Sequence, residues 1–257
     1  MSVAAVIIAR GGSIRLPGKN VKSFCGHPLV AWSIVQAQMS RLVDTVWLST
    51  DTDRIAEIGE RYGARIIRRP DWPDHNEVSA NRVFSHALDW IEENAGPYDT
   101  LLTMLPTSPL RYPHDIDEIL KMHLRVGERV VQAAQLRQCF ISRMVHPRMV
   151  RTILADKDRR HYQVIGGTVA QRWEWFREMV RGLESDLDAD LNAMRGDVED
   201  SYDRDVWFVP CRTFQCWETD VLEEFEIAEL LMKEYILPEG GGMEIYEEYR
   251  TMEVLDV

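Results

Sequence analysis

A glycine-rich loop with three cationic side chains follows the first apolar run of the sequence. Its candidate ligand-binding residues are Arg10, Gly11, Gly12, Ser13, Arg15, Lys19 and Asn20. Glycine lets backbone N–H groups approach a ligand closely, a serine hydroxyl adds a donor, and the bases supply positive charge. This combination favours a phosphate chain as the ligand, and the alternative is an ordinary surface loop. The glycine spacing fits neither a Walker A loop nor the GxGxxG dinucleotide fingerprint.

A stiff turn carrying hydroxyl groups follows a later apolar run. Residues 105–111 read Leu-Pro-Thr-Ser-Pro-Leu-Arg, and the two prolines restrict the backbone. Ligands of open α/β sheets collect at the carboxyl ends of strands, so we expect Thr107, Ser108 and Arg111 to face that edge. The alternative interpretation is a turn without a ligand.

Two acids separated by one residue, Glu218 and Asp220, precede the last amphipathic segment. In an extended backbone their side chains face the same side and could share a divalent cation. The alternative is a helix N-terminus, where acidic side chains interact favourably with the helix dipole.

Composition excludes several classes of protein. The 257 residues are 45% hydrophobic, with four cysteines and a net charge of −12. Residues 184–205 and 238–257 carry −7 and −5, whereas residues 1–70 carry +5. No long basic stripe favours nucleic acid, and no apolar run suits a membrane anchor or signal peptide. We expect one cytoplasmic domain over residues 1–257, with an acidic insertion at 184–205 and a tail at 238–257.

Predicted strands and helices alternate along the chain. Strands are predicted at 3–9, 45–49, 64–67, 100–105, 130–134, 150–154, 163–170 and 206–209. Helices are predicted at 28–41, 53–62, 78–93, 113–126 and from a cap at Thr219 to Ile236, and Thr50 or Asp51 is the expected cap of the second helix. Such alternation predicts a mostly parallel sheet covered by helices on both faces, a three-layer α/β/α fold.

Taken in order, these segments resemble the CMP-N-acylneuraminate (sialic acid) cytidylyltransferases. The matching segments are Ala9–Asn20, Ser49-Thr50-Asp51, Arg69-Pro70, residues 106–111 and the acid-x-Asp pair. The resemblance runs from about residue 3 to 135 and returns near 206–232. It implies a Rossmann-like nucleotidyltransferase α/β fold with a C-terminal insertion. It also implies magnesium-dependent transfer of CMP from CTP to an acidic acceptor, a nonulosonic (sialic-type) sugar acid, with release of pyrophosphate.

The resemblance also implies a role for each matching residue. The triphosphate would be held by Arg10, Gly11, Gly12, Ser13 and Lys19, with Arg15 supplying the charge of a usual lysine whose position is taken by Ile14. The cytidine would be contacted by Asn20 and Arg69, with Ser79 nearby. The acceptor would lie near Leu105, Thr107, Ser108 and Arg111, and Mg²⁺ would be bound by Asp220 and Glu218. Arg10, Lys19 and Asp220 would act in catalysis.

The sequence departs from the family mainly around the acceptor. Ile14 replaces a lysine, Leu105 replaces a glutamine, and residues 165–169 lack the usual Asn and Tyr. The segment between His146 and Gly166, which normally helps to form a homodimer, is shorter. Two alternatives therefore stay open, namely transfer to a phosphonate or phosphate monoester, and a catalytically silent nucleotide-binding relative.

Overall fold

A computed structural model describes seven ranges of the chain. They are residues 2–72, 78–112, 114–136, 140–146, 149–155, 161–184 and 206–239. The predicted acidic insertion after Glu184, and the tail beyond residue 239, lie outside these ranges. No described helix combines the length and apolar character needed to cross a bilayer.

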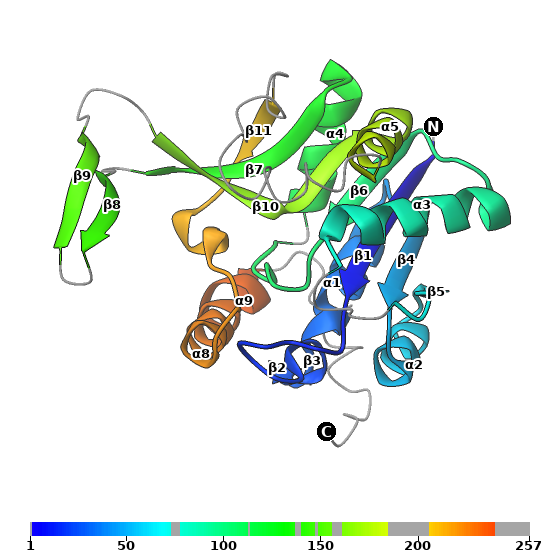
Figure 1. Cartoon of the computed structure of the whole chain (residues 1–257), viewed down its shortest axis with the longest axis horizontal. Coiled ribbons are helices and arrows are strands. Elements are labelled where there is room, and N and C mark those ends of the chain that lie inside the picture. Colours follow the sequence, from blue (N-terminus) through cyan, green and yellow to red (C-terminus); the bar gives the residue numbers. More distant parts are fainter. Residues whose placement is uncertain are drawn as a thin grey trace.

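A seven-stranded sheet forms the centre of the fold (Figure 1). In spatial order its strands are β11 (Val206–Pro210), β7 (Arg129–Leu136), β10 (His161–Arg172), β6 (Thr100–Met104), β1 (Val3–Ala9), β4 (Thr45–Thr50) and β5 (Arg65–Arg68). The β6–β1–β4–β5 pairs and the β11–β7 pair are parallel, whereas β10 is antiparallel to both β6 and β7. The prediction of a mostly parallel sheet is confirmed.

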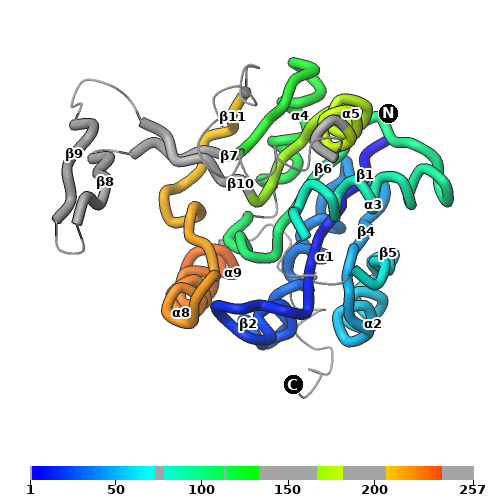
Figure 2. Tube along the Cα trace, viewed as in Figure 1, coloured from blue at the N-terminus to red at the C-terminus, as the bar shows by residue number. Residues whose placement is uncertain are grey.

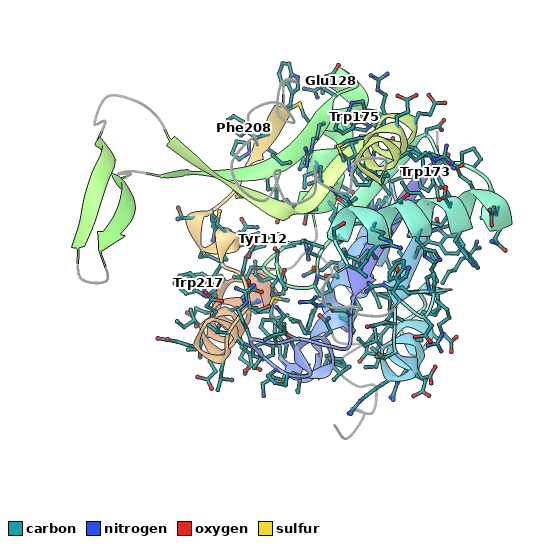
Figure 3. The ribbon with its side chains drawn as sticks, viewed as in Figure 1. Tyr112, Glu128, Trp173, Trp175, Phe208 and Trp217 are labelled. Carbon is teal, nitrogen blue, oxygen red and sulfur yellow. The ribbon has the colours of Figure 1, made fainter. Side chains whose placement is uncertain are left out.

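Helices cover both faces of this sheet. They are α1 (Leu29–Met39), α2 (Asp53–Arg61), α3 (Ala80–Ala95), α4 (Asp115–Val126), α5 (Trp173–Glu184), α8 (Leu222–Leu231) and α9 (Leu237–Glu239), with a π-helical turn at Met232–Ile236. Val3, Ala5 and Ile7 of β1 share a core with α1, α2, α4 and α8. Ala4 and Val6 belong to a second core with α3 and α5, where Figure 3 labels Trp173. Alternate side chains of one strand therefore face two helical layers, which confirms the three-layer fold.

A short hairpin that follows the loop after β1 contacts helix α8. Strands β2 (Ser23–Phe24) and β3 (His27–Pro28) are connected by Cys25 and Gly26, which have positive φ angles of 50° and 87°. Two successive positive φ angles suit a tight two-residue hairpin turn. The Cys25 N–H donates to Glu229 Oε1 at 2.7 Å, and the Phe24 and Phe225 rings meet edge to face at 5.2 Å. Figure 2 shows α8 beside β2 accordingly.

The structure corrects two predicted helix caps. Thr52, rather than Thr50 or Asp51, is the N-cap residue of α2. Val221 precedes α8, and Thr219 is fully buried. Glu224 accepts the N–H groups of Asp220 and Val221 at 2.9 and 3.1 Å. The carboxylate of this first-turn glutamate, rather than the hydroxyl of Thr219, therefore accepts N–H groups at the start of the helix.

Several elements were not predicted from the sequence. They are α5, the hairpin of β2 and β3, and strand β8 (Phe140–His146), which pairs with β9 (Met149–Ala155) in a separate two-stranded sheet. The strand pair β2–β3 is only two residues long on each side, too short for a periodic pattern.

Candidate active site

A cavity of about 430 Å³ opens where β1 and β6 end. Four cationic side chains line it, namely Arg10, Arg15, Lys19 and Arg69. Ser13, Asn20, Leu105, Thr107 and Asp220 are the other predicted site residues at its walls. Residues from five separate stretches of sequence meet here because the carboxyl ends of parallel strands share one edge of the sheet.

The loop after β1 is shaped by contacts within itself. Gly18 has a φ of +66°, a left-handed conformation that glycine adopts without strain, and it introduces a 3-10 turn over Lys19–Val21. Asn20 Nδ2 donates to the Arg10 carbonyl at 2.8 Å, which closes the loop. Lys19 is only 7% exposed as a result, so its charge is held in one place rather than extended into solvent.

Asp220 is the acidic centre of this cationic wall. Lys19 Nζ lies 2.7 Å from Asp220 Oδ1, and Arg15 Nη2 lies 2.7 Å from Asp220 Oδ2. Burial alone would raise the pKa of Asp220, but the Lys19 hydrogen bond and the charges of Lys19 and Arg15 outweigh it and lower that pKa. Asp220 is therefore ionised at neutral pH.

Glu218 lies in the field of the same charges. Burial and the nearby charge of Asp220 raise its pKa above the ordinary value, while Lys19 partly opposes this. The charge of Asp220 disfavours ionisation of Glu218, so a nearby cation would favour it, and carboxylate oxygens are the ligands that Mg²⁺ prefers. Within the described ranges no group of three or more His, Cys, Asp or Glu side chains could hold a metal ion. Magnesium needs fewer, since it keeps waters and takes substrate phosphates as ligands, so the pair fits.

Arg69 is positioned by strand β4. Its Nε donates to Ser49 Oγ at 3.1 Å and its Nη2 to the Ser49 carbonyl at 2.9 Å. Burial lowers the pKa of Arg69 to about 10, and nearby Asp51 opposes this shift. The guanidinium thus stays charged at pH 7 in a partly desolvated position, where it can bind an acceptor oxygen strongly. The sequence matched the Ser49 motif to the family but gave this serine no role.

The two glycines of the loop differ in the surroundings of their backbone N–H groups. The Gly11 N–H donates to Asp51 Oδ1 at 2.8 Å, so it is already paired. A Cβ at Gly11 would lie 2.3 Å from Thr52 Cγ2, which explains the glycine by packing against the α2 cap. Gly12 is exposed and lines no cavity described in this part of the chain. The expected phosphate contact is therefore not supported for the Gly11 N–H, and that of Gly12 stays a prediction.

Four further predicted residues do not line the cavity, and Glu218 is one of them, an exposed residue two positions before Asp220. Ser79 caps α3, its Oγ accepting the Arg82 N–H at 3.2 Å, while its neighbours Val78 and Ala80 line the cavity instead. Ser108 and Arg111 are 2% and 1% exposed, so the expectation that they face the ligand edge is wrong. Arg111 turns inward because backbone and side-chain oxygens inside the fold accept its N–H groups.

Sequence reasoning missed much of the apolar wall. Ile8, Val83 and Pro106 line the cavity together with Leu105 and the 75%-exposed Ile14. Alternation in β1 could have identified Ile8, whereas Val83 is brought in only by the docking of α3. The cavity is therefore cationic where the loop after β1 lies and apolar near α3 and residues 105–106.

Comparison with known proteins assigns the chain to a family. The sequence profile of the family described as "Cytidylyltransferase" matches residues 4–175. The chain belongs to the cytidylyltransferase family. This match confirms the resemblance seen in the motifs, and divalent metal is generally used in the family.

The curated relatives of this chain are enzymes named for sialic-type sugar acids. CMP-N,N'-diacetyllegionaminic acid synthase of Legionella pneumophila is 33% identical over 53% of this chain and 59% of its own length. N-acylneuraminate cytidylyltransferase of Oncorhynchus mykiss is 38% identical over 49% and 28%. Pseudaminic acid cytidylyltransferase of Campylobacter jejuni is 35% identical over 43% and 48%. The chain thus spans less than two thirds of the length of these relatives.

Solved structures agree on the fold. A CMP:2-keto-3-deoxy-manno-octonic acid synthetase complexed with CTP superposes with a TM-score of 0.62 at 16% identity, over 91% of this chain and 99% of that one. A 4-diphosphocytidyl-2C-methyl-D-erythritol synthase from Anaerococcus prevotii superposes with a TM-score of 0.65 at 14% identity, over 90% of this chain and 98% of that one. At these identities the likeness establishes the nucleotidyltransferase fold.

Proposed function

We propose that this protein transfers CMP from CTP to an acidic small-molecule acceptor, a nonulosonic (sialic-type) sugar acid, and releases pyrophosphate. The observation that carries this proposal is the Lys19–Asp220 pair inside a cavity lined by four cations. Similarity to synthases and cytidylyltransferases of legionaminic, N-acylneuraminic and pseudaminic acids supports the acceptor class.

The geometry suits such a transfer. An acceptor hydroxyl oxygen attacks the α-phosphorus of CTP, and the bond from this phosphorus to the oxygen that bridges to the β-phosphate breaks. Pyrophosphate leaves with the bonding electron pair, and the hydroxyl proton passes to solvent water. Negative charge spreads over the phosphoryl oxygens and the departing pyrophosphate, so fixed cations stabilise it without covalent chemistry. Lys19 is fixed by burial, whereas Arg15, whose side chain is 67% exposed, can follow the triphosphate.

Magnesium is the metal we propose for the Glu218–Asp220 pair. When bound, it would neutralise charge on the phosphate oxygens. Asp220 would hold it through the oxygens that Lys19 and Arg15 contact in the structure. Arg69 and Asn20, which also line the cavity, are proposed to contact the cytidine.

The test is pyrophosphate release from CTP and Mg²⁺ with a panel of acceptors. We expect turnover with at least one keto-deoxy sugar acid and none without an acceptor, with UTP in place of CTP testing the base preference. Turnover only with a phosphonate or phosphate monoester would replace the acceptor class, and the apolar Leu105 and Ile14 are the reason to include these compounds. Calorimetric CTP binding without turnover on any acceptor would identify a silent relative.

A homodimer and a cytoplasmic location complete the proposal. They rest on the family resemblance and on the absence of a membrane-spanning helix among the described residues. Sedimentation velocity at micromolar concentration tests the dimer, which a monomeric mass would exclude.

A further inference from the structure

The buried guanidinium of Arg111 connects several segments of the chain behind the cavity wall. It is 1% exposed and makes five hydrogen bonds. Nη2 donates to the Leu105 and Gly167 carbonyls, both at 2.9 Å, and Nε donates to Thr168 Oγ1 at 2.5 Å. Nη1 donates to Gln36 Oε1 at 2.9 Å and to Ser33 Oγ at 3.3 Å. One side chain thus ties the turn at 105–111 to β10 and to α1.

The same turn holds the segment that carries the acidic pair. Thr219 is fully buried, and both its N–H and its Oγ1 donate to the Thr107 carbonyl, at 3.0 and 3.3 Å. Gln215, four residues earlier, donates from Nε2 to the Leu110 carbonyl at 3.2 Å. Figure 3 labels Trp217, which directly precedes the acidic pair, beside the helix labelled α8 in Figure 1.

The position of Thr219 in the sequence explains why its contact with Thr107 matters for the acidic pair. Thr219 lies between Glu218 and Asp220, so a shift of its backbone moves both carboxylates. The donors of the next two residues go to Glu224, which fixes the pair to α8 but not to the cavity wall. Thr219 therefore adds a link from the pair to the Thr107 carbonyl, beside the ion pairs of Asp220 with Lys19 and Arg15, and Arg111 holds the turn of Thr107 from the interior side.

We propose that Thr219 and Arg111 are positioning residues for the metal-binding pair. Arg111 fixes the 105–111 turn, and Thr219 fastens Glu218 and Asp220 to the Thr107 carbonyl of that turn. Neither side chain lines the cavity, so neither touches the nucleotide. This inference rests on the proposed metal site and adds to it two residues that act through others.

Thr219→Val is the sharpest test because valine keeps the shape and loses only the hydroxyl donor. The probe is Mn²⁺ binding to the protein in the presence of CTP, followed by electron paramagnetic resonance. We expect binding weakened by about 2- to 10-fold, the worth of one hydrogen bond. Thr219→Ser, which keeps the hydroxyl, should restore most of the affinity.

The matched control is Thr103→Val. Thr103 is also buried and also donates from Oγ1 to a backbone carbonyl, that of Val169 at 3.4 Å, but it lies within β6 away from the acidic pair. Thr103→Val should leave Mn²⁺ affinity unchanged. Equal weakening in both variants, or none in Thr219→Val, would overturn the proposal.

Arg111→Lys gives a second, independent measurement. Lysine keeps the charge but cannot make the branched set of bonds. We expect weaker Mn²⁺ affinity and a higher Mg²⁺ requirement for turnover, with metal-free CTP binding preserved as the sign of an intact fold. Metal affinity equal to that of the unchanged protein would exclude the role of Arg111. Because Mn²⁺ binding needs no acceptor, the result is separate from a failure to find the reaction.

Discussion

Lys19 Nζ and Asp220 Oδ1 lie 2.7 Å apart although 201 residues separate them in the sequence. The pair joins the loop after the first strand to the segment before α8. Lys19 is nearly buried, and Asp220 keeps 23% of its side chain exposed toward the cavity. Two segments far apart in the sequence therefore supply the cationic and the acidic part of a single site.

Removing either partner of this pair should stop the transfer. We expect Lys19→Ala and Asp220→Ala each to lower the rate of pyrophosphate release by on the order of 10² or more, since each removes a charge placed on the reacting phosphates or their metal. Lys22→Ala is the control, because Lys22 lies over the Phe225 ring outside the cavity. Near-normal turnover of either site variant would show that the site is misassigned.

Glu218→Gln should stabilise the metal-free protein at pH 7. Burial and Asp220 raise the pKa of Glu218 above its usual 4.5, so its ionised form is disfavoured in the folded state relative to the unfolded chain. The destabilisation exists above the folded pKa and disappears as pH falls through it toward 4.5. Melting temperatures in EDTA should therefore be higher for the variant at pH 7 and equal to the original below pH 4.5.

The same Glu218→Gln substitution should weaken metal binding. A glutamine cannot supply a carboxylate charge, so Mn²⁺ affinity in the CTP complex should fall. Glu223→Gln on the exposed first turn of α8 serves as the control. A variant that is no more stable than the original at pH 7, or that binds Mn²⁺ equally well, would contradict this account of Glu218.

Replacing Arg69 should weaken CTP binding more than it alters the fold. Its hydrogen bonds to Ser49 aim the charged group into the cavity, and bonds involving a charged group contribute about 1.5–3 kcal/mol, or roughly 10- to 100-fold in affinity. Calorimetry with CTP measures Arg69→Met against Arg68→Met, whose side chain pairs with Asp53 on the surface. Equal affinities of the two variants would place the cytidine elsewhere.

Gly167→Ala should destabilise the protein although Gly167 does not line the cavity. A Cβ there would lie 2.1 Å from Ser108 Oγ and 2.6 Å from Ser108 Cβ. Relieving this overlap requires movement of β10 or of the 105–111 turn, at a cost of about 1–3 kcal/mol in the free energy of unfolding. Urea unfolding checks the value, and adding Ser108→Gly should recover part of it. Loss of stability that Ser108→Gly leaves unchanged would point to another cause.

The local pattern of the sequence was sufficient to predict the fold class and the polar loop after β1. Short β-branched runs such as Val3–Ala9 predicted buried strands, and signals such as Gly63 after α2 and Pro113 before α4 predicted helix ends, because both depend on residues close in sequence. The bases of the loop after β1 and the acid-x-acid pair also carry their chemistry in their own residue types. These features identified the family before any tertiary contact was known.

Tertiary structure decided which of those residues reach the cavity. Arg111 and Thr219 looked like a ligand-facing base and a helix cap, yet both are buried and hold the turn and the acidic pair in place. Gly11 looked like a phosphate contact and is instead a close approach to Thr52. Sequence determines what a side chain can bind, but the direction it points depends on oxygens and neighbours brought together from distant segments, which only the folded chain supplies.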